Sequence, residues 1–175
     1  MQATVSNRPI LVYGNQALRK RAKPVTVVSP ELKRLAEDML ESMYESNGIG
    51  LAAPQVGESV RLIVVDVSGG EGKEKQPLVL FNPEILSSKG ETVAEEGCLS
   101  VPGVWADVTR PEIITLRAMD RDGKPFELKG IDGILARCIQ HEIDHLEGVL
   151  FVDKISSTDR LLNEAKLKKM ARQAK

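Results

Sequence analysis

The chain has 175 residues, 42% of them hydrophobic and 28% charged, and this balance excludes a wholly disordered protein. Aromatic residues make up only 3% and the formal net charge is −1, which argues against a basic or aromatic-rich nucleic-acid binder. We find neither an apolar run long enough for a membrane span nor a signal peptide, so we expect a cytoplasmic protein forming one domain over residues 1–175, with no membrane partner and no sequence-specific nucleic-acid partner.

The N-terminal third predicts an extended arm followed by a helix. Residues 1–29 alternate short apolar pieces with proline and glycine. Ser29 followed by Pro30 and Glu31 is typical of a helix start, because serine caps the first N–H groups and proline fits the first helical position. Apolar residues then recur at helical spacing, and we expect this helix to end near Asn47 and Gly48.

The middle of the chain predicts short strands separated by turns. Residues 68–77 are rich in glycine and lysine and indicate an exposed loop, and residues 121–124 indicate a tight turn. The expected strands are 61–67, 78–81, 85–86, 104–108, 113–118 and 126–128.

Two helices complete the prediction, at 130–147 and from about 157 to 171. Because the strands do not alternate with helices, a parallel sheet is unfavourable and the order indicates an α+β fold. We expect antiparallel strands packed around a central metal-binding helix over 130–147, with one further helix near each end of the chain.

The metal-binding assignment rests on His141-Glu142-Ile143-Asp144-His145, which fits the H-E-x-x-H pattern. Residues four apart lie one above the other on a helix, so both imidazoles can bind one ion. Glu142 lies about 100° further around the helix and can reach a water on that ion. These are the only two histidines in the chain, and an apolar face on the same helix indicates that it is buried rather than solvated.

A catalytic metal site needs a third protein ligand, for which the two cysteines are the candidates. Cys138 lies on the same helix but about 10 Å along the axis from His145, too far for one ion to bind both, so we interpret it as a buried thiol. That leaves Cys98, which follows Gly97, although a small core residue is an equally good interpretation of Cys98 taken alone. Two cysteines do not form a disulfide framework, and in the cytosol we expect both thiols to stay reduced.

Three segments together resemble one family. Residues 48–55 (Gly-Ile-Gly-Leu-Ala-Ala-Pro-Gln), 96–100 (Glu-Gly-Cys-Leu-Ser) and 141–145 match, in order and spacing, the signature motifs of peptide deformylases. The segment from Ile10 to Arg19 also looks like the start of that family, and the C-terminal helix resembles the shorter bacterial type. Trp105 departs from the pattern, standing where Arg or Tyr is more usual, at the expected rim of the substrate cleft.

The resemblance implies a role for ten residues. It implies one divalent ion on Cys98, His141 and His145. Fe²⁺ is favoured by the resemblance, although the same ligands also suit Zn²⁺, Ni²⁺ and Co²⁺. It implies that Glu142 is the general base and acid. It implies that Gln55 and the backbone N–H of Leu99 bind the oxyanion and that the backbone of Gly50 pairs with substrate. Ile49, Ile134 and Cys138 are placed to line a methionine slot, for which core packing is an equally good interpretation.

The implied reaction removes the N-formyl group from the N-terminal methionine of nascent polypeptides and releases formate. From position 159 to 175 six basic residues stand against two acidic ones, so the ribosome surface is a candidate partner for this helix, although a solvated face explains the charge as well.

Two other functions share part of the pattern. A zincin-type metallopeptidase also uses H-E-x-x-H, but no further histidine or evident acidic ligand follows. A structural site in a binding module would need a fourth protein ligand, which Cys138 is poorly placed to supply.

Overall fold

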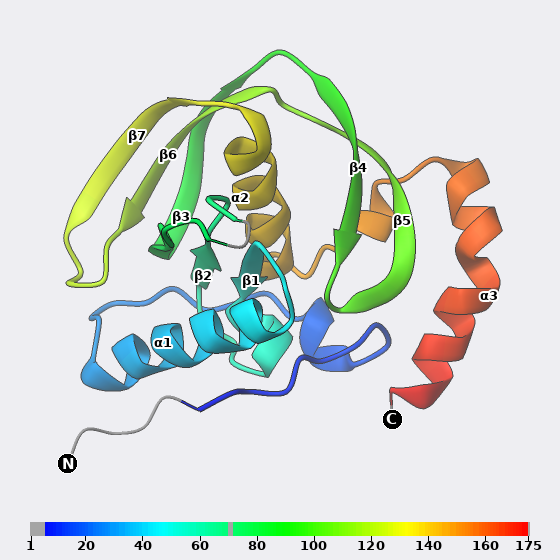
Figure 1. Cartoon of the computed structure of the whole chain (residues 1–175), viewed down its shortest axis with the longest axis horizontal. Coiled ribbons are helices and arrows are strands. Elements are labelled where there is room, and N and C mark those ends of the chain that lie inside the picture. Colours follow the sequence, from blue (N-terminus) through cyan, green and yellow to red (C-terminus); the bar gives the residue numbers. More distant parts are fainter. Residues whose placement is uncertain (1–5, 70–71, 175) are drawn as a thin grey trace.

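The computed structural model describes residues 6–69 and 72–174 and shows an α+β fold (Figure 1). Helix α2 lies between a five-stranded antiparallel sheet and a separate antiparallel pair, β4 and β5. Within the described ranges, no helix is both long and apolar enough to cross a membrane. The elements are η1 (Gln16–Arg19), α1 (Pro30–Glu45), β1 (Gly50–Ala52), η2 (Ala53–Val56), β2 (Leu62–Val65), β3 (Leu78–Lys89), β4 (Thr92–Cys98), β5 (Val101–Arg110), β6 (Ile113–Met119), β7 (Pro125–Ile131), α2 (Gly133–Leu146), η3 (Phe151–Asp153) and α3 (Ser157–Gln173).

Helix α1 begins where its local sequence predicts. The Ser29 side chain accepts a hydrogen bond from the Leu32 N–H at 3.2 Å, and Pro30 is the first helical residue. The helix buries an apolar face against β1 and β2. The segment before it is largely irregular, as expected, apart from the short helix η1; residues 1–5 of the predicted arm lie outside the described residues.

The five-stranded sheet has the order β1-β2-β3-β6-β7, with every neighbouring pair antiparallel. Strand β1 therefore forms one edge, and it runs beside α2. An edge strand keeps a row of backbone N–H and C=O groups without strand partners, and this edge opens into the cleft described below.

The predicted break at Asn82 and Pro83 is wrong, because one strand, β3, runs through it. The register with β6 shifts between Phe81 and Glu84, which is a bulge, and proline is tolerated at bulges. Asn82 has a positive φ of 49°, and its side chain bonds both backbone polar groups of Val25, at 2.8 and 2.7 Å. A contact 57 residues away in sequence therefore stabilises the bulge.

Helix α2 begins three residues later than predicted. Ile131 still pairs with Ile114 in the β7–β6 ladder, and the chain turns into the helix only at Gly133, whose φ is 61°. Positive φ favours glycine, so the change from strand to helix falls at that residue. The predicted turn at 121–124 joins β6 to β7, and α3 extends two residues beyond its predicted end.

Two separate apolar cores flank the helix. One contains the inner face of α2 and the five-stranded sheet, with Ile139 and Leu146 fully buried. The other lies between β5, η3 and α3 and includes Val108, Phe151 and Leu167. Cys138, on one side of the site described next, belongs to the first core, and Cys98, on the other side, packs against the second.

Candidate active site and metal centre

Helix α2 buries four polar side chains, of which Gln140 donates to the carbonyls of Pro111 and Ala136 and the other three form a group. His141, Glu142 and His145 are 8%, 4% and 1% exposed. The imidazole rings lie one turn apart, with their centroids separated by 5.2 Å. Buried polar groups need partners, so their grouping indicates a site rather than ordinary core packing.

Strand β4 brings Cys98 to the two imidazoles. Cys98 pairs with Val101, which leaves Leu99 and Ser100 as the tight turn between β4 and β5. One ligand atom from Cys98 and one from each histidine all lie within 4.8 Å of one another. The 3.4 Å from Cys98 Sγ to His145 Nε2 matches the roughly 3.5 Å ligand separation of a tetrahedral ion with bonds of about 2.0–2.3 Å.

The donor set fits a divalent metal ion with a water on it. Among the described residues, two buried side-chain atoms have no hydrogen-bond partner, and they are Oε2 of Glu142 and Nδ1 of His145. The first lies on the carboxylate beside the cluster, where it could accept from a water. A thiolate with two imidazoles is a ligand set that Zn²⁺ and other first-row divalent ions accept.

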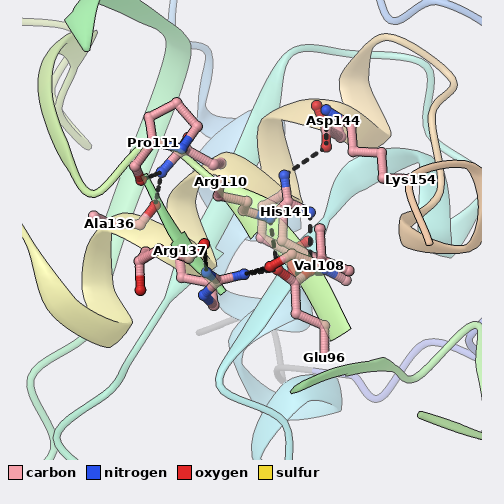
Figure 2. Close-up of polar contacts among 12 residues, drawn as sticks. Glu96, Val108, Arg110, Pro111, Ala136, Arg137, His141, Asp144 and Lys154 are labelled. Carbon is pink, nitrogen blue, oxygen red and sulfur yellow. Dashed lines mark hydrogen bonds and ion pairs between the residues drawn. The ribbon is translucent and has the colours of Figure 1, made fainter. Parts of the chain in front are cut away.

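Glu96 lies between His141 and Arg110 and bonds both of them (Figure 2). Its Oε1 accepts from His141 Nδ1 at 2.9 Å, while Arg110 makes a two-pronged contact with its carboxylate at 2.6 and 2.9 Å. Burial acts to raise the pKa of Glu96, but the hydrogen bonds from Arg110 and His141 outweigh it and lower the pKa to about 2. The carboxylate is therefore ionised and directs Nε2 of His141 toward the cluster.

The other titratable groups respond mainly to burial. Burial raises the pKa of Glu142 to about 7, against the charges of His141 and Arg110, which lower it. Burial also lowers the pKa of His145 and keeps this ring neutral, as a metal ligand must be. For His141 the effect of burial is outweighed by Cys98 and Glu96, which raise its pKa to about 10.

Gln55 and Leu99 approach the cluster from two other elements. The Gln55 side chain is held by its Oε1, which accepts from the Ala52 N–H at 2.9 Å. Its Nε2 is left to donate to Ser100 Oγ at 3.0 Å and toward Cys98 Sγ at 3.6 Å. Leu99 occupies the turn directly after Cys98, so its backbone lies beside the same atoms.

Gly50 lets β1 lie against α2. A Cβ at Gly50 would lie only 2.7 Å from Cys138 Sγ and 2.8 Å from Glu142 Oε1, both on α2. Cys138 Sγ donates to the Ile49 carbonyl at 3.5 Å, and burial raises the pKa of the Cys138 thiol well above its ordinary value. Cys138 is thus the buried thiol that the sequence predicts.

A cleft of about 900 Å³ opens over these groups. Its walls include Ile49 and Ile134, which are 40% and 59% exposed and so are not simply core residues. The rim includes Trp105, whose ring covers Gly97 so closely that a Cβ there would lie 2.4 Å from it. The predicted site residues Gly50, Gln55, Cys98, Leu99, Cys138, His141 and Glu142 also line the cleft, and His145 lies beneath it.

The sequence analysis missed the charged groups behind the centre. The position of Glu96 could have been predicted from the sequence, because residues two apart on a strand share a face and Glu96 precedes Cys98 by two residues. Arg110 and Arg137, which both bond Glu96, carry no local signal of a role.

Most of the chain is similar to known proteins of one family. The family model for polypeptide deformylase matches residues 7–161. A peptide deformylase of Alkalilimnicola ehrlichii is 51% identical over 95% of this chain and 92% of its own length, and one of Chromobacterium violaceum is 51% identical over 94% and 96%. The crystal structure of a Legionella pneumophila peptide deformylase superimposes with a TM-score of 0.86 at 49% identity, covering 96% of this chain and 97% of that one. The chain therefore belongs to the polypeptide deformylase family.

Proposed function

We propose that this enzyme hydrolyses the N-formyl group on the N-terminal methionine of newly made polypeptides and releases formate. The observation that carries the proposal is the grouping of Cys98, His141 and His145, with Glu142 and Gln55 beside them, at the floor of an open cleft. Family membership supports the same reaction.

We infer that Cys98 and the two imidazoles hold one divalent ion, Fe²⁺ in the native enzyme. When bound, such an ion lowers the pKa of a coordinated water and polarises the carbonyl under attack. Affinity order alone favours Zn²⁺ over Fe²⁺, so the preference for iron rests on the family resemblance.

Glu142 is the general base and then the general acid. Its buried carboxylate, with a pKa near 7, is suited to accept a proton from the attacking water near neutral pH. It then returns that proton to the peptide nitrogen as the C–N bond of the formamide breaks. The partnerless Oε2 of Glu142 is the atom available for this transfer.

Gln55 Nε2 and the Leu99 N–H stabilise the oxyanion that develops on the formyl oxygen. Because Gln55 Oε1 is already bonded to Ala52, the amide orientation is fixed before substrate arrives. Removing one such preorganised donor commonly costs about 2.7–4 kcal/mol of transition-state stabilisation.

The peptide binds as an added strand. Gly50 lies on the edge strand β1, where its backbone can pair with the substrate chain. Ile49, next to β1, and Ile134 and Cys138 on α2 line the cleft and offer the methionine side chain an apolar slot.

The test is formate release from formyl-Met-Ala-Ser by metal-loaded protein purified without oxygen. We expect one formate per peptide, with Met-Ala-Ser as the other product and no internal cleavage. Cleavage of unformylated peptides would instead indicate a metallopeptidase. Loss of folded structure when the ion is removed, with no formate release before removal, would indicate a structural metal site.

We also propose that α3 binds the ribosome surface. Lys168, Lys169 and Arg172 are exposed on this helix, whereas Lys166 donates to the Gly103 carbonyl at 3.1 Å. Leu167 is buried against β5, so deleting the helix would damage the fold, and charge reversal is the better test. Replacing the three exposed cations by glutamate should abolish ribosome co-sedimentation at low salt while leaving deformylation of a tripeptide unchanged; unchanged co-sedimentation would exclude this partner.

A further inference from the structure

The candidate metal ligands come from two separately packed parts of the protein. His141 and His145 lie on α2, which packs on β1, β2 and β6. Cys98 ends β4, in the pair of strands that packs on η3 and α3. A metal site holds its geometry only if the distance between these two parts is fixed, because ligand bonds tolerate deviations of about 0.2 Å.

Arg137 connects the two parts through three hydrogen bonds. It projects from α2, one turn before His141, and its side chain is only 11% exposed. Its guanidinium donates to Glu96 Oε2 at 2.6 Å, to the Val108 carbonyl of β5 at 2.9 Å and to the Thr92 carbonyl of β4 at 2.9 Å (Figure 2). One helical side chain therefore bonds both strands of the pair.

The Glu96 contact places this connection next to the metal ligands. Glu96 precedes Cys98 by two residues on β4 and bonds His141 through its other oxygen. Arg110 bonds Glu96 as well and reaches Asp144 on α2 at 2.8 Å, and Lys154 lies 3.3 Å from the same Asp144, so both carboxylates of the network are paired with cations. Buried charges are tolerated only when they are paired and hydrogen-bonded, as both carboxylates are here.

We propose that Arg137 is a positioning residue that fixes the β4–β5 pair against α2, so that Cys98 stays within reach of the ion held by His141 and His145. Its guanidinium acts on the centre through Glu96 and the two strand carbonyls. The inference rests on the proposed metal site and adds a residue to it.

The chemistry of arginine suits this position. A guanidinium offers five donors in a rigid plane and can bond three acceptors at once, whereas a lysine ammonium is a compact point charge. If Arg137 is replaced, Glu96 still has Arg110 and His141, so no buried carboxylate loses all its partners. We therefore expect a looser site in a folded protein rather than a collapsed one.

The test compares Arg137→Met, which keeps most of the apolar stem that lines the cleft, with Arg137→Lys. The matched control is Arg117→Met, which removes an arginine paired with Glu84 on the exposed face of β3 and β6. Each protein is loaded with Co²⁺, and transfer of the ion to a chelator is followed by absorption at a temperature where circular dichroism shows all of them folded. Kinetics on formyl-Met-Ala-Ser separate kcat from KM.

We expect Arg137→Met to release Co²⁺ about tenfold faster than the parent and to lower kcat with little change in KM, since outer residues of metal sites typically change affinity 10- to 100-fold. The thiolate-to-cobalt absorption should weaken, Arg137→Lys should be intermediate, and Arg117→Met should match the parent. Release at the parental rate from folded Arg137→Met, or from Arg137→Lys if the methionine variant does not fold, would overturn the proposal while leaving the deformylase function intact. A parent protein that neither binds Co²⁺ nor releases formate would refute both.

Discussion

Gly50→Ala tests whether the fit between β1 and α2 sets the geometry of catalysis. The added Cβ would lie 2.7 Å from Cys138 Sγ, 2.8 Å from Glu142 Oε1 and 3.0 Å from Glu142 Cγ. Ordinary contacts between such atoms are about 3.5–4.0 Å, so the strand and helix must separate by about 1 Å. Both helical residues are buried, since Cys138 and Glu142 are 5% and 4% exposed.

A displacement of this size is large for catalysis and moderate for stability. Misplacing a reacting group by 1 Å can cost about 100-fold in rate, so we expect kcat for formate release to fall about 100-fold. Overpacking of a close contact typically costs about 1–3 kcal/mol, which should appear as a lower urea midpoint. Adding Cys138→Ala should restore part of the stability but little of kcat, because the contact with Glu142 remains.

The matched control is Gly69→Ala, because no atom of the described residues beyond its chain neighbours lies within 4 Å of the position its Cβ would take. Formate release by coupled formate dehydrogenase and urea unfolding, both on metal-loaded protein, measure the two effects. If Gly50→Ala keeps the parental kcat and midpoint while it binds metal normally, the contact between β1 and Glu142 does not position the base.

Three other predictions concern the base, a buried carboxylate and the metal. Glu142→Gln should bind metal and fold normally, as elemental analysis and circular dichroism can check, yet lose at least about 100-fold in turnover because an amide accepts no proton; near-parental turnover would exclude Glu142 as the base. Burial alone would raise the pKa of Asp66, but hydrogen bonds from Ser68 and Tyr44 lower it overall. A lowered pKa means that ionised Asp66 stabilises the fold above about pH 4 and that this stability is lost as the pH falls through its folded pKa. The urea midpoints of the parent and Asp66→Asn should therefore differ at pH 6 and converge toward pH 3, and a constant difference would contradict this. Air exposure should inactivate iron-loaded protein and add oxygen to Cys98, but spare nickel-loaded protein and Cys138, as peptide mass spectrometry can check; equal decay of both forms would show that the iron or ligand assignment is wrong.

Features that depend on neighbours along the chain can be predicted from the amino-acid sequence. Ser29 and Pro30 start α1 because a cap and a fixed φ act within one turn. The spacing of His141, Glu142 and His145 places them together because the helical repeat alone decides it. The helical rise per residue likewise excluded Cys138 as a second ligand, beside His145, to the same ion. The three motifs taken together indicated the family.

Features that depend on residues far apart in the sequence become visible only in the folded protein. The strand that continues through Pro83 does so because Asn82 bonds Val25, which no local pattern encodes. Arg137 and Glu96 are 41 residues apart, and their contact forms only once α2 lies across the β4–β5 pair. Charged residues in a sequence usually face solvent. Here the packing of two separate cores around α2 removes water from Arg137 and Glu96, and buried charges must be paired.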